Sequence, residues 1–227
     1  MTKKLQGVGA SVLRKEDDRY LRGRGQFVGD IKIPGMLDVA FVRSPIAHGL
    51  IKAIHRPEGF ADRIFTMADL PGVKPIRAVS GLSGFKPSDQ WPLAKDKVRQ
   101  VGELIAACIG PDRACAEDLA QQVFVDFDEL PAVVDPLAAR KNPPSLVHDE
   151  WGDNIFLETF VDGNIEAIKN APIKISRHIH TARQCMSPLE GRGVICQWDS
   201  RLNQLTMWTS AQMVHRSEEH TSELQSH

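Results

Sequence analysis

The sequence predicts a mixed α/β protein, and three neighbouring stretches carry the prediction. Residues 104–109 form a wholly apolar run that a Gly-Pro pair ends, which is typical of a strand buried on both faces. Residues 114–121 are rich in helix formers, and the carboxylate of Asp112 can accept from the amides of the first helical turn. Residues 123–128 place Val, Val and Phe at alternate positions, which is strand spacing. Strand, helix and strand together predict a helix packed on a sheet.

Size and composition indicate a globular protein with one large domain or two ordinary ones. The chain has 227 residues, of which 42% are hydrophobic and 25% charged. A net charge of −1 gives no electrostatic reason to expect a nucleic-acid or membrane partner. No apolar run approaches the roughly 20 residues of a membrane span, and no apolar segment follows the N-terminal lysines as in a secretion signal. The four cysteines form no CxxC pair, so we expect reduced thiols and a cytoplasmic location.

The first 45 residues predict an arm, a turn and a core strand. Residues 1–18 are polar with mixed charge, and we expect an extended N-terminal arm there. Residues 22–25 (Arg-Gly-Arg-Gly) favour a turn with solvated arginines, and a phosphate or RNA contact is the alternative. Pro34 and Gly35 fit the centre of a type II turn, because Gly supplies the positive φ. Residues 36–42 have the length and composition of a core strand.

Further short elements follow before the central unit. Residues 49–54 and 64–66 predict strands, residues 67–73 a helical turn, and residues 75–91 a loop without a hydrophobic period. His48 lies directly after the first core strand. A hydrogen-bonding corner residue is the favoured interpretation of this histidine, and a catalytic base is the alternative.

The second half of the chain predicts a linker and a smaller set of elements. Residues 139–153 contain Lys-Asn-Pro-Pro and few apolar positions, so we place a linker there. Residues 165–170 predict a helix of under two turns, with Asn164 as its cap. Residues 193–198 and 204–209 predict the two strands of a β-hairpin.

Residues 173–181 alternate between apolar and polar side chains, which predicts a strand. His178 and His180 would share one face of that strand, and Cys185 follows. Two histidines on a solvent-facing side are the plain interpretation. Metal ligation is the alternative, although a third ligand at a recognisable spacing is missing.

Ten short stretches, taken in order, carry a resemblance to a known family. They are residues 21–25, 33–37, 40–45, 68–72, 101–103, 116–118, 130–136, 188–190, 192–194 and 205–212. In order and spacing they resemble the molybdopterin-binding large subunit of the xanthine dehydrogenase, aldehyde oxidase and aerobic carbon monoxide dehydrogenase family. The resemblance implies an α/β-hammerhead domain at residues 19–138 and the start of the first molybdenum-cofactor-binding domain at residues 154–215.

The same resemblance implies a molybdenum-dependent oxidoreductase. Members of this family hydroxylate a carbon centre, or oxidise carbon monoxide, with water as the oxygen source. The resemblance implies a molybdenum–molybdopterin cofactor, which we expect in a dinucleotide form, and a small-molecule substrate. It also implies two partner proteins, an iron–sulfur small subunit with [2Fe-2S] centres and an FAD-binding medium subunit. A hammerhead-like binding or assembly module without redox chemistry is the alternative from another class.

Gln212 is the residue that the resemblance places nearest the metal. Its amide matches the donor to the apical oxo group, and a neutral donor fixes that group without adding charge. Ala211 stands where a threonine is common, and on its residue type alone Gln212 is a polar residue at a strand end. Glu190 and Arg192 match positions that flank the site, with Gly191 in place of the usual proline, and we expect a buried ion pair between them.

The last stretch departs from the resemblance after His215. Residues 216–227 resemble the translation of a sequencing-library adapter, and a natural hydrophilic tail is the alternative. We therefore expect a truncated reading frame that lacks the family's glycine-rich cofactor loop and late glutamate base, and is inactive by itself. We also expect residues 155–209 to be poorly packed.

Overall fold

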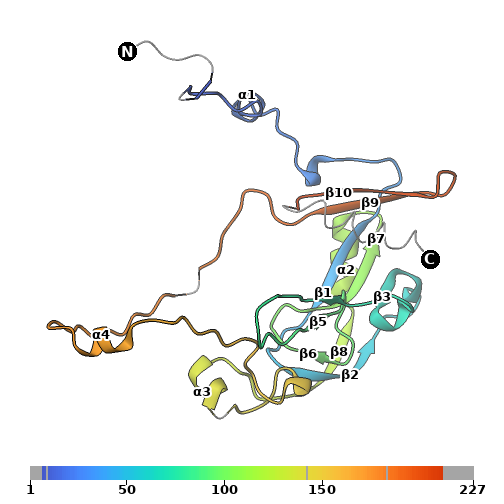
Figure 1. The fold of residues 1–227 in the computed structure, drawn as a ribbon. Helices are drawn as coiled ribbons and strands as arrows, with labels where there is room; N and C mark the ends of the chain where they lie inside the picture. Colours follow the sequence, from blue (N-terminus) through green and yellow to red (C-terminus); the bar gives the residue numbers. More distant parts are fainter. Residues whose placement is uncertain (1–6, 9, 142, 183, 212–227) are drawn as a thin grey trace. The chain divides into compact units, whose positions relative to one another are not determined.

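The computed structural model describes residues 7–8, 10–141, 143–182 and 184–211, which divide into two compact units (Figure 1). The central unit is Gly35–Lys174. The terminal unit combines the described residues of Met1–Pro34 with those of Ile175–His227.

One sheet of the central unit has β7 (Leu104–Gly110) between β1 (Asp38–Arg43) and β3 (Ile64–Thr66), with both neighbours antiparallel to it. The helix α2 (Arg113–Gln121) follows β7 directly. The carboxylate of Asp112 accepts from the Cys115 amide at 2.8 Å, which confirms the predicted cap. The predicted strand, turn and helix around residue 110 are therefore all present.

A second sheet places β2 (Gly49–His55) between β6 (Lys97–Val98) and β8 (Phe124–Glu129), again antiparallel. The chain thus passes from β7 in the first sheet through α2 to β8 in the second. The strands predicted at residues 49–54 and 123–128 are confirmed. The short strand β6 had no signal in the sequence, because two residues are too few to show a period.

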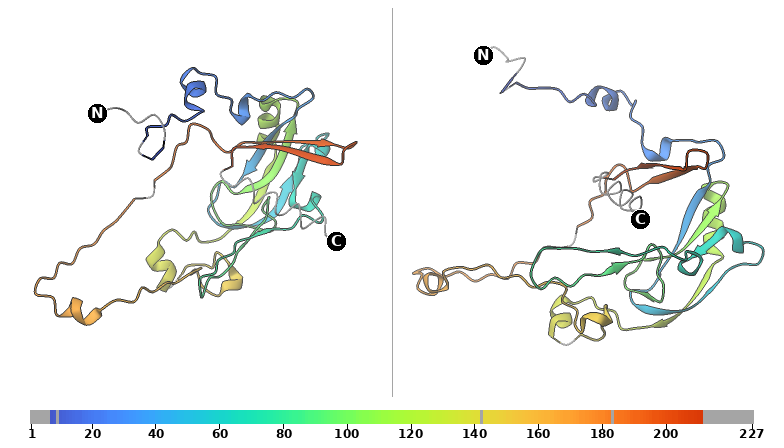
Figure 2. Two further views of the ribbon diagram at one scale, coloured as in Figure 1. Left: turned by 45° about the horizontal axis from the view of Figure 1, so that its top comes forward. Right: turned by 45° about the vertical axis from the view of Figure 1, so that its right-hand side comes forward.

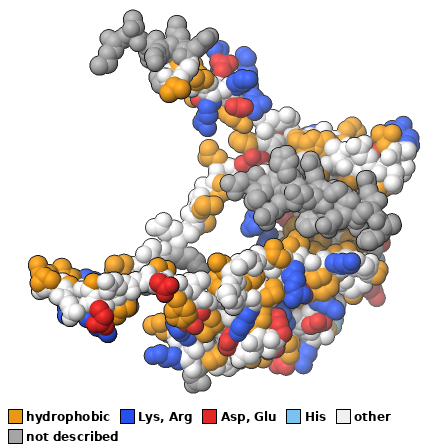
Figure 3. Space-filling model, in the orientation of Figure 1, with side chains coloured by type: hydrophobic (Ala, Val, Ile, Leu, Met, Phe, Trp, Pro, Cys, Tyr) orange, Lys and Arg blue, Asp and Glu red, His pale blue; other side chains and the backbone are white. Residues whose placement is uncertain are grey.

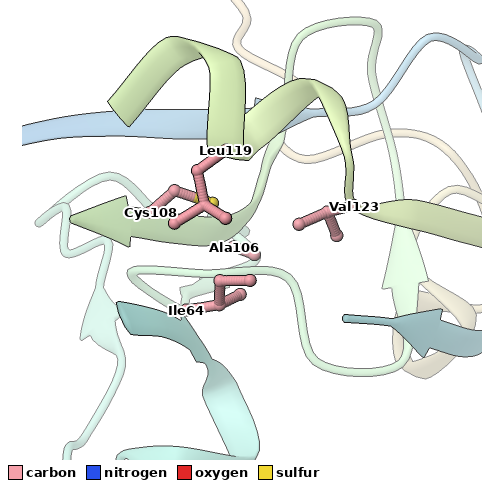
Figure 4. Packing of buried hydrophobic residues seen from close by; sticks show 5 residues of the cluster. All are labelled: Ile64, Ala106, Cys108, Leu119 and Val123. Atoms are coloured by element: carbon pink, nitrogen blue, oxygen red, sulfur yellow. The ribbon is translucent and has the colours of Figure 1, made fainter. Parts of the chain in front are cut away.

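Two clusters of buried side chains hold the sheets and α2 together. One contains Ile64, Ala106, Cys108, Leu119 and Val123, and the other Ala94, Val98 and Ile105. Figure 4 shows Leu119 reaching down from α2 toward β7, and Ile64 comes from the neighbouring strand β3, opposite Cys108. Val42 and Ile54 pack against both clusters, so the two sheets share one core. Each fully buried aliphatic side chain there stabilises the fold by about 1.5–3 kcal/mol.

The remaining elements of the central unit are short. The predicted turn at Pro34 and Gly35 is present, with a φ of 77° at the glycine, and η3 lies where a helical turn was predicted. The stretch predicted as a loop, residues 75–91, contains one small strand pair, β4 with β5 (Figure 2). The bounds of the short elements are η2 (Ala61–Arg63), η3 (Met67–Asp69), β4 (Ile76–Arg77), β5 (Asp89–Gln90), α3 (Pro136–Lys141), η4 (Asp149–Trp151) and α4 (Ile165–Lys169).

Helix α4 confirms the prediction at residues 165–170, and the Asn164 side chain accepts from the Ala167 amide at 2.9 Å. The helix is nevertheless barely packed. Ile165 is 57% exposed and Ile168 65% exposed, and hydrophobic side chains lie at the surface there (Figure 3). Such exposure agrees with the expected poor packing after residue 155.

The terminal unit contains the predicted hairpin, formed by β9 (Val194–Asp199) and β10 (Gln204–Thr209). It also contains η1 (Val28–Asp30) and the one-turn helix α1 (Asp17–Leu21), which starts inside the expected extended arm. The turn predicted at residues 22–25 is present, with a φ of 66° at Gly23.

The predicted strand at residues 173–181 is wrong. None of these residues, all of which the structure describes, belongs to a strand. The isoleucines of the alternating pattern are 77–85% exposed. Alternation alone does not make a strand, because the backbone groups also need a neighbouring strand to pair with.

Two findings concern the cysteines and the helices of the described residues. All four cysteines, which lie among the described residues, are free thiols. Within the described ranges no helix has the length and hydropathy needed to cross a membrane.

Candidate functional site

His48 is a buried corner residue, as favoured from the sequence. Its Nδ1 lies 3.1 Å from the Pro131 carbonyl oxygen and 3.1 Å from Ser145 Oγ, and that hydroxyl donates to the same carbonyl at 2.7 Å. Because a carbonyl only accepts, Nδ1 carries the proton. Nε2 is buried without a hydrogen-bond partner among the described residues. The ring holds three segments together, and among the described residues no carboxylate hydrogen-bonds to it.

Residues 143–156, where most of the predicted linker lies, are held on the central unit by cationic side chains. Lys97 is only 7% exposed, and its ammonium donates to the Leu146 carbonyl and to Asp149 Oδ2, each at 2.9 Å. Arg99 Nε donates to the Val147 carbonyl at 3.1 Å. The hydrogen bond from Lys97 lowers the pKa of Asp149, so this carboxylate stays charged.

A second group of contacts fixes the far end of the same segment. Lys86 Nζ donates to Asp153 Oδ1 at 2.6 Å and to the Trp151 carbonyl at 3.2 Å. The Trp151 indole donates to the Pro87 carbonyl at 3.1 Å and stacks on the His148 ring with centroids 4.1 Å apart. Burial, with the charge of Arg99 nearby, lowers the pKa of His148. These contacts are structural, because they join the segment to residues 86 and 87.

Asp69, inside the stretch at residues 68–72, is the centre of a charged cluster in the central unit. Its Oδ2 accepts from Arg56 Nη2 at 2.5 Å and from the Thr66 amide and hydroxyl, each at 2.7 Å. Burial raises the pKa of Asp69, but these hydrogen bonds and the Arg56 charge outweigh it and lower the pKa from 3.8 to about 2. The cluster ties the end of β2 to the end of β3.

Glu190 and Arg192 do not form the expected ion pair. Glu190 Oε1 instead accepts from the Val28 amide at 3.0 Å, and Arg192 is exposed. The expectation was wrong because Glu190 has a partner 162 residues away, which a local pattern cannot reveal. Beside this contact, Ser210 bonds to the backbone of Gly193.

The candidate metal ligands of the sequence are not brought together. His178, His180 and Cys185 are all exposed. Across the part of the chain that the structure describes, no three His, Cys, Asp or Glu residues are grouped so that they could hold a metal ion. Gln212 lies outside the described residues, and the last described residue before it is Ala211.

Two family models match the chain in the order that the motifs predicted. The model described as "Aldehyde oxidase and xanthine dehydrogenase, a/b hammerhead domain" matches residues 22–131, which lie mostly in the central unit. The model described as "Molybdopterin cofactor-binding domain" matches residues 147–225. The chain belongs to the molybdopterin-binding large-subunit family of xanthine dehydrogenases and aldehyde oxidases. The predicted family and the α/β-hammerhead fold are therefore confirmed.

Relatives within this family include enzymes with different substrates. The chain is 33% identical to the carbon monoxide dehydrogenase large chain of Hydrogenophaga pseudoflava, with 93% of this chain and 28% of the relative covered. It is 33% identical to the nicotine 6-hydroxylase large subunit of Paenarthrobacter nicotinovorans, with 92% and 26% covered. Quinoline 2-oxidoreductase from Pseudomonas putida 86 matches with a TM-score of 0.82 and 32% identity, over 93% of this chain and 27% of that chain. The chain thus spans about a quarter of the length of these relatives.

The described residues just before Gln212 bond to one another. Ser210 Oγ accepts from the Gly193 amide and donates to the Gly191 carbonyl. The structure gives no test of a cofactor ligand at Gln212, because that residue lies outside the described ranges. The sequence did not assign a role to Ser210 or Val28, because only the fold reveals that each meets the turn at residues 190–193.

Proposed function

We propose that this chain supplies the hammerhead domain and the first stretch of the molybdopterin-binding domain of a molybdenum hydroxylase large subunit. The whole protein oxidises or hydroxylates a small carbon substrate, such as carbon monoxide, an aldehyde or an N-heterocycle, with water as the oxygen source. The observation that carries the proposal is the match to quinoline 2-oxidoreductase at 32% identity and a TM-score of 0.82 over 93% of the chain.

In this proposal Gln212 provides a hydrogen-bond donor at the reaction centre. Its neutral amide N–H would donate a hydrogen bond to an oxygen ligand of the bound metal without adding charge. When bound, the molybdenum–molybdopterin, in a dinucleotide form, supplies the redox centre that accepts two electrons from the substrate. The other cofactor contacts and the general-base glutamate would come from sequence other than residues 1–227.

The electrons leave through partner proteins. We assign these as an iron–sulfur small subunit with [2Fe-2S] centres and an FAD-binding medium subunit. The names of the relatives, "large chain" and "large subunit", support an assembly of several chains. The four free cysteines support a cytoplasmic location, where thiols stay reduced.

For the domain organisation we propose an arm at residues 1–18, the hammerhead at 19–138, a linker at 139–153 and the molybdopterin-binding part at 154–215, with a foreign tail at 216–227. The contacts of Lys97 and Lys86 give the linker a fixed path on the central unit. Residues 143–156 of this stretch pack within the central unit.

Electron transfer in the assembled protein tests the proposal. The complete large subunit is expressed together with the proposed iron–sulfur and FAD-binding subunits, and the purified complex is mixed anaerobically with carbon monoxide, aldehydes and N-heterocycles. One of these classes is expected to bleach the visible absorbance of the iron–sulfur centres and the flavin. A complex that contains both partners but no redox-active metal would contradict the proposal and favour the non-catalytic hammerhead module.

A further inference from the structure

The start of the cofactor-binding match lies in a segment that packs with the hammerhead. We call this segment, residues 143–156, the strap. The hammerhead match ends at residue 131 and the cofactor-binding match begins at residue 147, yet the whole strap belongs to the central unit, Gly35–Lys174. Residues 147–156 are therefore assigned to one domain by sequence similarity and pack with the other in the structure.

The first residues of the strap are fixed to the corner at His48, between β1 and β2. Ser145 Oγ donates to the Pro131 carbonyl at 2.7 Å and lies 3.1 Å from His48 Nδ1. The Leu130 amide donates to the His48 carbonyl at 3.0 Å, and His48 is only 4% exposed. These hydrogen bonds join the strap to the start of β2 and to the chain that leaves the end of β8.

Two cations on and beside β6 hold the middle of the strap. Lys97 Nζ donates to the Leu146 carbonyl and to Asp149 Oδ2, each at 2.9 Å. Arg99 Nε donates to the next strap carbonyl at 3.1 Å. Val98, the residue between the two cations, is fully buried in one of the core clusters. The strap is thus bound by side chains that lie directly beside the core.

Asn154 closes the strap on itself. Its Oδ1 accepts from the Val147 amide at 2.9 Å, and its Nδ2 donates to the Ser145 carbonyl at 2.9 Å. The two hydrogen bonds use both ends of the carboxamide to hold the second half of the strap against the first. A side chain that both accepts and donates is needed for this, and an aliphatic side chain can do neither.

The last residues of the strap are held by the loop at residues 85–87. The Lys86 amide donates to the Phe156 carbonyl at 2.7 Å, and the Lys86 ammonium donates to Asp153 Oδ1 at 2.6 Å. The rings of Phe85 and Phe156 meet edge to face, with their centroids 6.3 Å apart. The beginning, the middle and the end of the strap are therefore all fastened to the central unit.

We propose that the strap and the two sheets of the central unit fold and open as one cooperative unit. A surface loop that is held at one point opens by itself, whereas a segment fastened at three places opens only with its support. The hammerhead then serves as the template on which the first residues of the cofactor-binding domain take their shape. The proposal goes beyond the proposed function, because a molybdenum-free assembled protein would refute that function and leave the exchange behaviour of the strap unchanged.

Native-state hydrogen exchange of the 227-residue chain at increasing urea concentrations tests the proposal. The amides of Val147 and Lys86 report on the strap, because each donates to a strap acceptor. We expect their exchange free energies to fall with urea along the same slope as those of the β7 amides, since one opening exposes all of them. The Ala167 amide, in the exposed helix α4, is the control for local opening and should give a slope near zero. Strap slopes like that of Ala167 would overturn the proposal.

The Asn154→Ala variant gives an independent measurement. It removes both hydrogen bonds inside the strap, and we expect the Lys86 amide and the β7 amides to exchange faster by the same factor, about tenfold. Asn170→Ala, at an exposed position after α4, is the matched control and should change neither. Unchanged exchange of the β7 amides in Asn154→Ala would overturn the proposal, because the strap would then open alone. The urea series on wild type decides the question even if Asn154→Ala does not fold.

Discussion

Replacing Asp69 by asparagine tests the charged cluster that joins β2 to β3. Asparagine keeps an acceptor oxygen for the Thr66 amide but loses the charge that Arg56 contacts. A pKa lowered from 3.8 to about 2 corresponds to about 2.5 kcal/mol of folding free energy. The Asp69 side chain is 32% exposed, so solvent screening reduces this to about 1–2 kcal/mol. We expect Asp69→Asn to lower the free energy of unfolding by that amount near neutral pH.

The pH dependence gives the sign of the effect. Because the folded-state pKa of Asp69 is lowered, its contribution is fully present above the unfolded value of about 4. This stabilising contribution of Asp69 is lost as the pH falls from about 4 through about 2. The difference in stability between wild type and Asp69→Asn should therefore shrink over this window.

Urea unfolding, followed by tryptophan fluorescence and far-UV circular dichroism at a series of pH values, measures both effects. Asp62→Asn is the matched control, since Asp62 is an exposed aspartate in η2, and we expect it to change stability by less than about 0.5 kcal/mol. Equal stabilities of the Asp69→Asn and Asp62→Asn variants at neutral pH would refute the reasoning. A difference that stays constant from neutral pH down to the acid limit would refute the electrostatic part of it.

Three further predictions concern the connecting segment and the turn before β9. Lys97→Met should make the amides of residues 145–150 exchange at least about ten times faster, because the buried ammonium holds that segment. Lys74→Met, at an exposed site, is the control and should leave these exchange rates unchanged. Equal exchange rates in the two variants would contradict the prediction. Burial lowers the pKa of His148, so the folded protein favours the neutral ring. As the pH drops below about 6.5, the stability of wild type, measured by fluorescence, should therefore fall relative to that of His148→Gln. A constant difference across that range would count against this interpretation. Gly193→Ala should lower the thermal midpoint of the terminal unit by a few degrees, because the added Cβ would press on the Val28 side chain. Gly191→Ala, which has open space around it, is the control and should leave the midpoint unchanged. Identical midpoints in the two variants would contradict the prediction.

The sequence was sufficient where a signal is local. The apolar run before Gly110, the cap at Asp112 and the helix after it all depend on residues within a few positions of one another. The same holds for the β9–β10 hairpin and for the cap at Asn164. Local propensity, cap and hydrophobic period agree in each of these places, so the structure follows the prediction.

Contacts between distant residues could not be predicted in this way. Lys97 is buried because it reaches Asp149, 52 residues along the chain, and nothing near either residue indicates the pair. Glu190 likewise meets Val28 rather than the nearby Arg192. The stretch at residues 173–181 failed for the opposite reason, since its pattern is right for a strand but no neighbouring strand pairs with it.

In the candidate site, too, local signals were predicted and contacts between distant residues were not. The family motifs pointed to Gln212 through order and spacing, a signal that a single sequence carries. Ser210 was missed and Glu190 was given the wrong partner, because only the fold brings Gly193 to the serine and Val28 to the glutamate. Asp69 was recognised as part of a motif, while its hydrogen bonds to Arg56 and Thr66 appeared only in the structure.

Metal analysis of the assembled protein tests the central claim most directly. The complete large subunit, expressed with the proposed iron–sulfur and FAD-binding subunits, should contain about one molybdenum per large chain together with iron and flavin, and the 227-residue chain alone should contain no stoichiometric molybdenum. A complete large subunit that folds and binds its partners without any molybdenum would contradict the account.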